Sequence, residues 1–112
     1  MANEQNTVPM GPDIEALKSQ HGDVWRARTD EAGDFYYRRN TAAEYQRFVD
    51  EINSQTKSNS AAMLSVVLSA VVYPPTSELR NILNKYPGLT LLLAGKIQEA
   101  NGTGMELDVS KV

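Results

Sequence analysis

Between residues 41 and 53 the hydrophobic positions recur with a helical period. They follow the spacing i, i+3, i+4, i+7, which places them on one face of a helix. The four positions are Tyr45, Phe48, Val49 and Ile52. They are preceded by the run Thr41-Ala42-Ala43-Glu44, which has the pattern of a capping box. In a capping box the threonine oxygen accepts a hydrogen bond from a backbone N–H of the first turn, and the glutamate side chain accepts one from the backbone N–H of the threonine. The sequence therefore predicts an amphipathic helix that begins after Thr41.

After a polar loop at residues 53–60, the run from Ala61 to Tyr73 is apolar on nearly every side. Such a run marks an element that is buried all round. Its valines suit a strand, but its length of about 13 residues and its alanines favour a helix that ends at Pro74-Pro75. We expect four of its residues to be almost fully buried, namely Leu64, Val67, Leu68 and Val71.

Two more helices are predicted towards the C-terminus, at residues 76–85 and 89–101. Pro87-Gly88 separates them, and Gly102 closes the second. The second helix contains three consecutive leucines, Leu91-Leu92-Leu93, which span more than half of a helix circumference at about 100° per residue. Because a helix at the edge of a small domain buries one face, the leftover apolar face is expected to meet a partner or a second copy.

The N-terminal part predicts a short helix and a β-hairpin. Residues 12–20 have a proline and acidic residues in a first helical turn. Residues 24–29 and 34–39 are rich in aromatic and β-favouring residues, and their four-residue link ends in Gly33. A lone hairpin is marginal in water, so we expect Trp25 and two of the three following aromatics to pack inward. These three are Phe35, Tyr36 and Tyr37.

Together these elements predict an α+β fold in which the hairpin packs on a bundle of about four helices. The predicted single domain covers residues 12–102, between a flexible arm at residues 1–11 and a flexible tail at residues 103–112. A chain of 112 residues has room for one core. Its N-terminus lacks a basic-then-apolar pattern and its longest apolar run is too short for a membrane span, so we expect a cytoplasmic protein with no membrane partner.

Composition argues against catalysis. With no cysteine there is no thiolate nucleophile and no cysteine-based metal site, and with a single histidine, His21, histidine-based sites are excluded or reduced to a single ligand. The glycines lack the spacing of a phosphate loop. We therefore expect no enzyme, no cofactor and no metal.

The hairpin arginines leave a nucleic-acid alternative open. Arginines beside aromatic residues on strands are typical of folds that stack single-stranded nucleic acid. Acidic residues interleave, however, so residues 24–47 carry five arginines against four acids. In the competing interpretation the aromatic rings are core and the arginines lie over them.

Three segments resemble small phage tail assembly chaperone-like proteins. The run from Tyr36 to Tyr45 resembles the family element F-R-[RK]-P-[ST]-x-x-E, with Asn40 at the position of the proline. The runs VVYPP at 71–75 and KYPGL at 85–89 resemble two later turns of the family. The resemblance covers about residues 23–102 and implies a non-enzymatic chaperone that coats a long helical tape-measure protein in the infected host cytoplasm. A structural or adaptor subunit of a phage particle remains the alternative, beside the hairpin-based nucleic-acid binder.

The late apolar residues predict where a helical partner binds. Two arginines at the end of the hairpin are expected to flank this surface and to pair with acids on the bound helix. Self-association through the same leucines is almost equally plausible. The predicted partner-binding residues are Arg38, Arg39, Leu79, Leu83, Tyr86, Leu89, Leu92 and Leu93.

We predict no salt-sensitive binding to single-stranded DNA or RNA at physiological ionic strength. Because five arginines face four acids between residues 24 and 47, few phosphate contacts remain, and each contributes roughly one unit to the salt slope. The measurement is a binding titration at two salt concentrations. Tight binding with a steep salt dependence, lost on substitution of Arg26 and Arg28, would reverse the order of the hypotheses.

Overall fold

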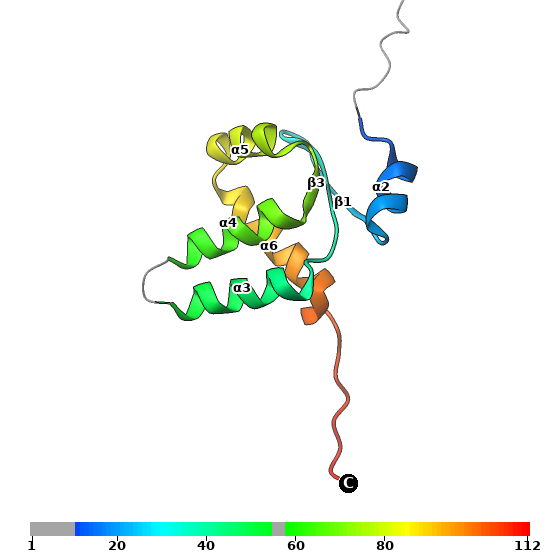
Figure 1. Cartoon of the computed structure of the whole chain (residues 1–112), viewed down its shortest axis with the longest axis vertical. Helices are drawn as coiled ribbons and strands as arrows, with labels where there is room; N and C mark the ends of the chain where they lie inside the picture. Colours follow the sequence, from blue (N-terminus) through cyan, green and yellow to red (C-terminus); the bar gives the residue numbers. More distant parts are fainter. Residues whose placement is uncertain (1–10, 55–57) are drawn as a thin grey trace, which may run out of the picture.

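A computed structural model describes residues 11–54 and 58–112 of the chain. The predicted arm at residues 1–11 lies outside the described residues except for Gly11, and so does the centre of the predicted loop at residues 53–60. Figure 1 shows the order of the elements along the chain. They are α2 (Ile14–His21), β1 (Trp25–Thr29), β2 (Gly33–Tyr37), α3 (Ala42–Asn53), α4 (Asn59–Ala70), β3 (Val71–Tyr73), α5 (Thr76–Lys85), α6 (Gly88–Gln98) and η1 (Glu99–Thr103).

The predicted hairpin is present. Strands β1 and β2 pair antiparallel, from Trp25 opposite Tyr37 to Thr29 opposite Gly33. The turn is closed by the hydroxyl of Thr29, which accepts from the backbone N–H of Ala32 and donates to the carbonyl of Gly33, each over 2.8 Å. Gly33 has φ +86°, a conformation that costs glycine little. The second strand begins at this glycine, one residue earlier than predicted.

The end of the long apolar run is a strand, and this corrects the prediction of one helix from Ala61 to Tyr73. Helix α4 ends at Ala70, and β3 pairs antiparallel with β2. The sheet order is β1-β2-β3, so β1 is an edge strand. The β-branched Val71 and Val72 tolerate the extended backbone well, and the residue before a proline is pushed out of the helical region. Pairing with β2 outweighs the length and the alanines that favoured a helix.

Helix α3 begins as predicted. The Thr41 hydroxyl accepts from the backbone N–H of Glu44 over 3.1 Å, and the Glu44 carboxylate accepts from the backbone N–H of Thr41 over 3.0 Å. Its four predicted apolar positions are half-buried, whereas Gln46, Arg47 and Asp50 are exposed. In Figure 1 α3 runs alongside α4, and their residues are in contact.

The core lies where α4, α6 and the sheet meet, with α5 covering one end. Val67 is fully buried and Val71 is 7% exposed, as predicted. The prediction is wrong for Leu64 and Leu68, which are half-buried at the margin of the core. The buried residues of α4, which contacts both α3 and α6, are alanines and valines: Ala62, Val66, Val67 and Ala70. The buried core residues are Phe35, Tyr37, Val66, Val67, Ala70, Val71, Leu79, Leu83, Leu93, Ala94 and Ile97.

The chain ends in a wide turn and an extended tail. Helix α6 continues into η1, where Gly102 has φ +130°, a region open mainly to glycine. Residues 105–112 form no helix or strand, and Figure 1 shows them running away from the domain. The predicted α+β class is confirmed: a hairpin, extended by β3, packs on helices. None of the helices in the described residues has the length and apolar character needed to cross a bilayer.

We predict that Leu79→Ala lowers the free energy of unfolding by about 2–5 kcal/mol, because Leu79 is fully buried and its truncation leaves a cavity. Leu91→Ala is the matched control: Leu91 is 62% exposed, so its loss should change stability by less than about 0.5 kcal/mol. Urea unfolding measures both. Equal losses from the two substitutions would contradict this assignment of the core.

Candidate protein-binding site

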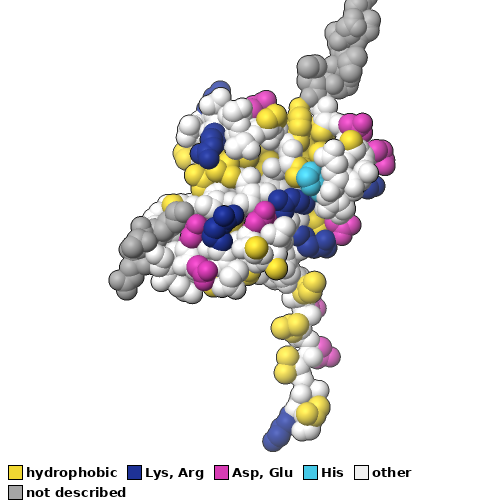
Figure 2. Space-filling view, viewed as in Figure 1, with side chains coloured by type: hydrophobic (Ala, Val, Ile, Leu, Met, Phe, Trp, Pro, Cys, Tyr) yellow, Lys and Arg dark blue, Asp and Glu magenta, His cyan; other side chains and the backbone are white. Residues whose placement is uncertain are grey.

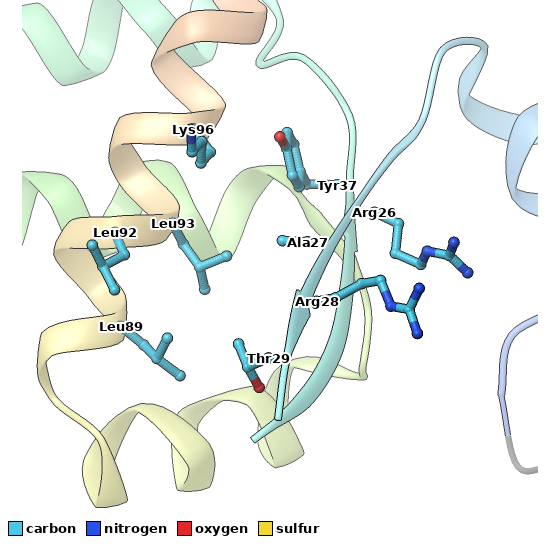
Figure 3. A pocket seen from close by; sticks show the side chains of 9 residues that line it. All are labelled: Arg26, Ala27, Arg28, Thr29, Tyr37, Leu89, Leu92, Leu93 and Lys96. Carbon is cyan, nitrogen blue, oxygen red and sulfur yellow. The ribbon is translucent and has the colours of Figure 1, made fainter. Parts of the chain in front are cut away.

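A largely apolar groove lies between the hairpin and α6. Its volume is about 340 Å³. Figure 3 shows Leu89 and Leu93 of α6 directed towards the hairpin, with Ala27, Thr29 and Tyr37 on the facing side. We call this the β1–α6 groove; it is lined by Arg26, Ala27, Arg28, Thr29, Tyr37, Leu89, Leu92, Leu93 and Lys96.

The groove follows the free edge of the sheet. Four consecutive residues of β1, from Arg26 to Thr29, border it. Because β1 is the edge strand of the sheet, the groove borders that edge. An edge strand presents N–H and C=O groups that no neighbouring strand pairs. The groove thus combines an apolar wall with a row of backbone hydrogen-bonding groups.

Helix α6 has the leftover apolar face that its sequence predicts. Leu93 is 3% exposed and belongs to the core, whereas Leu91 and Leu92 are 62% and 66% exposed. Leu92 lines the groove and Leu91 lies next to it on the helix. The predicted binding residues include Leu92 and Leu93 but omit Leu91. The run of three consecutive leucines in the sequence already indicated that one of them would be exposed.

Burial corrects three of the predicted binding residues. Leu79 and Leu83 are at most 6% exposed and lie in the core away from the groove, so a partner does not reach them. Leu93 belongs to the floor of the groove but is only 3% exposed, so it offers a partner little surface. Leu89 and Leu92 line the groove as the prediction requires. Tyr86 is half-buried outside the groove, and the Lys85 ammonium lies 5.5 Å from its ring centre.

Arg38 is a structural residue, which corrects its predicted role in partner binding. Its guanidinium donates two hydrogen bonds to the Glu44 carboxylate, over 3.0 and 3.1 Å. It also donates to the carbonyl oxygens of Arg39 and Ser69, over 2.7 and 2.9 Å. The side chain is only 20% exposed. Four of its five guanidinium N–H groups donate inside the molecule, so Arg38 is held by its own domain and not directed at a partner.

Asn40 occupies the position at which the phage chaperone motif has a proline, and its hydrogen bonds show what the asparagine contributes there. Its side-chain amide donates to Glu44 and to the carbonyl of Val66 in α4, over 3.3 and 3.4 Å. Its carbonyl oxygen accepts from the Asn101 amide over 2.8 Å, and its backbone N–H donates to Asn101 over 2.9 Å. A proline lacks both the backbone donor and the side-chain amide. Asn40 therefore links α3, α4 and η1.

Arg39 lies outside the groove, beside the start of β1. Its guanidinium carbon is 4.7 Å from the centre of the Trp25 ring, and it forms a 2.9 Å ion pair with Asp23. It also donates to the carbonyl of Ala100 over 3.1 Å. Its side chain is 51% exposed, so contact with a partner stays a prediction for Arg39. The arginine lies over the aromatic ring, as expected if the hairpin aromatics belong to the core and the arginines cover them.

The aromatic residues of β2 are not a stacking platform. Phe35, Tyr36 and Tyr37 are all less than a tenth exposed, so their ring faces are covered. Tyr37 also stacks on Trp25 at 5.9 Å. Burial, with a smaller effect of the Glu99 charge, raises the pKa of the Tyr37 hydroxyl. Within the described residues no group of three or more histidine and acidic side chains is placed to hold a metal ion.

Comparison with known proteins assigns the family. A model described as a domain of unknown function, DUF6848, matches residues 17–110. The chain belongs to this family. The DUF6848 chain is also similar to a solved structure, the uncharacterised protein rbstp2171 from Bacillus stearothermophilus, with 28% sequence identity and a TM-score of 0.70. The likeness covers 88% of this chain and 100% of that one, and a search of curated proteins finds no match.

The Arg38–Glu44 pair predicts a pH-dependent stability. Hydrogen bonds from Arg38 are the main reason why the pKa of Glu44 falls from 4.5 to about 2. Because the folded pKa is the lower one, the stabilisation is complete above the unfolded pKa and is lost as the pH falls from about 5 to about 2. We predict that Glu44→Gln lowers the free energy of unfolding by about 1.5–3 kcal/mol at pH 7 and by much less near pH 2.

Urea unfolding at a series of pH values measures this difference. Asp50→Asn is the matched control, since it removes an exposed carboxylate from the same helix and should leave the wild-type pH dependence in place. A Glu44→Gln protein with the same loss at both ends of the pH range would contradict the assigned role.

Proposed function

We propose that this DUF6848 protein is a non-enzymatic chaperone that binds an amphipathic helix of another protein. The resemblance to small phage tail assembly chaperone-like proteins supplies the class of partner, a long helical tape-measure protein of phage tail assembly. On this proposal the chaperone covers apolar stripes of that protein until the tail tube assembles around it.

The exposed leucines of α6 carry the proposal. Leu91 and Leu92 are two large apolar side chains in succession, each more than 60% exposed, and Leu92 continues into the β1–α6 groove. Fully burying a leucine contributes roughly 1.5–3 kcal/mol, so a partner that covers both gains a useful share of its binding energy there. An amphipathic helix offers a matching apolar stripe, and such helices commonly bind in apolar grooves.

Charge at the groove favours a partner helix with acidic residues beside its apolar stripe. Lys96 lies on the α6 side of the groove, and Arg26 and Arg28 border it from β1, although their side chains point to the opposite side of the hairpin (Figure 3). All three side chains are exposed. Such rim charges affect the rate of association and the choice of partner more than the affinity.

The test is co-expression with the tape-measure protein of the same genome, followed by co-purification. We expect the chain to keep that protein soluble and to purify with it. The double variant Leu91→Gln and Leu92→Gln should weaken binding by roughly tenfold or more, because glutamine preserves the helix but removes the apolar surface. Ile14→Gln is the matched control, since Ile14 is an apolar residue of α2 with 42% exposure outside the groove.

A tape-measure protein that stays insoluble beside the wild-type chain would exclude the chaperone function. Equal binding by the wild type and the Leu91→Gln, Leu92→Gln variant would show instead that a partner binds elsewhere on the surface.

A further inference from the structure

The C-terminal tail has the residue pattern of a β-strand but no partner strand. From residue 105 it reads Met-Glu-Leu-Asp-Val, so apolar and acidic side chains alternate. An alternation of this kind is typical of a strand with one buried face. Met105, Leu107 and Val109 are 74%, 86% and 83% exposed. Figure 2 shows these hydrophobic side chains spaced along a tail that touches nothing beyond its first residues.

The β1–α6 groove offers the complementary pattern. An added strand would meet Leu89 and Leu92 of α6 on its inner face, with Tyr37 of β2 also lining the groove. On the opposite side of the hairpin Figure 3 shows Arg26 and Arg28, two residues apart like the two acids of the tail. Within the described part of the chain neither arginine forms an ion pair.

We propose that residues 105–109 of a second copy of this chain add as a strand to the free edge of β1. Met105, Leu107 and Val109 then face the apolar wall of the groove, while Glu106 and Asp108 face Arg26 and Arg28. The five residues span about 17 Å, the length of the five-residue β1. Addition of an extended segment to a sheet edge is a common mode of recognition.

The direction of the tail favours a second copy over the same chain. Met105 borders a second hollow, of about 380 Å³, beside Trp25 at the start of β1, and the tail then runs away from its own domain (Figure 1). To pair with β1 of its own chain, the tail would have to reverse its direction at Met105, the residue at which the added strand must begin. The tail of another copy reaches the groove without that reversal. Reciprocal exchange of two tails gives a closed dimer in which both exposed segments are covered.

The inference does not depend on the proposed chaperone function, since it concerns the chain alone and is tested without any partner. The family model extends to residue 110, so the alternating segment lies within the matched region. A bound tail covers Leu89 and Leu92, so self-association and partner binding compete for the groove.

The experiment uses two charge-reversal variants of the full chain. The acidic-groove variant carries Arg26→Glu and Arg28→Glu, and the basic-tail variant carries Glu106→Lys and Asp108→Lys. Light scattering after size-exclusion chromatography, over a range of concentrations, measures the mass. We expect a dimer for the wild type and a dissociation constant raised about tenfold or more for each variant alone, because groove and tail then have like charge.

Mixing the two variants is the decisive measurement. In a mixed dimer the basic tail meets the acidic groove and the acidic tail meets the arginine groove, so both contacts are complementary and wild-type affinity should return. The control pair replaces Arg47 and Arg80, exposed on α3 and α5, with glutamate and should dimerise like the wild type. Circular dichroism checks that each variant is folded.

Three outcomes would overturn the proposal. In the first, the wild type is monomeric at every concentration. In the second, the mixture of the two variants has a dissociation constant no lower than that of either variant alone. In the third, the protein is monomeric and its tail amides are protected from hydrogen exchange. The last result would place the tail on its own chain. Failure of this test leaves the co-purification test of the chaperone function independent, because that test measures a different partner.

Discussion

The arrangement of the domain depends on one ion pair, Arg38 with Glu44. Arg38 follows β2, and Glu44 belongs to the first turn of α3. The guanidinium also donates to Ser69 at the end of α4, and the Arg38 backbone N–H donates to the carbonyl of Ala70 over 3.0 Å. The same carboxylate closes the capping box of α3. One pair of opposite charges therefore links the end of a strand to two helices.

This constraint also places the groove. Arg38 holds the end of β2 against α4, and the hairpin therefore packs on α4 and α6. Strand β3 pairs with one edge of β2, whereas the outer edge of β1 borders the groove. Asn40 and Asn101 extend the constraint to η1, so the start of the C-terminal tail is held beside the same hairpin. The binding surface and the segment proposed to occupy it are positioned by one hydrogen-bonded network.

The groove combines two kinds of recognition. Its apolar wall on α6 suits any segment with an apolar stripe, whereas the free edge of β1 suits only an extended backbone. A partner helix would use the exposed leucines, and a tail strand of a second copy would use the edge together with the arginines. Since Leu92 serves both, the proposed dimer is a state in which the surface for a partner is protected from unwanted contacts.

The sequence by itself determined the elements whose signals are local. The capping box at Thr41 marked the start of α3, the glycine-containing link marked the hairpin, and Pro87-Gly88 marked the break before α6. The tertiary structure decided what depends on neighbours distant in sequence. The run from Ala61 to Tyr73 became helix and strand because β2 was available to pair with its last three residues. Leu83 entered the core and Arg38 turned inward because the elements around them closed over one face, and periodicity identifies an apolar face without showing what covers it.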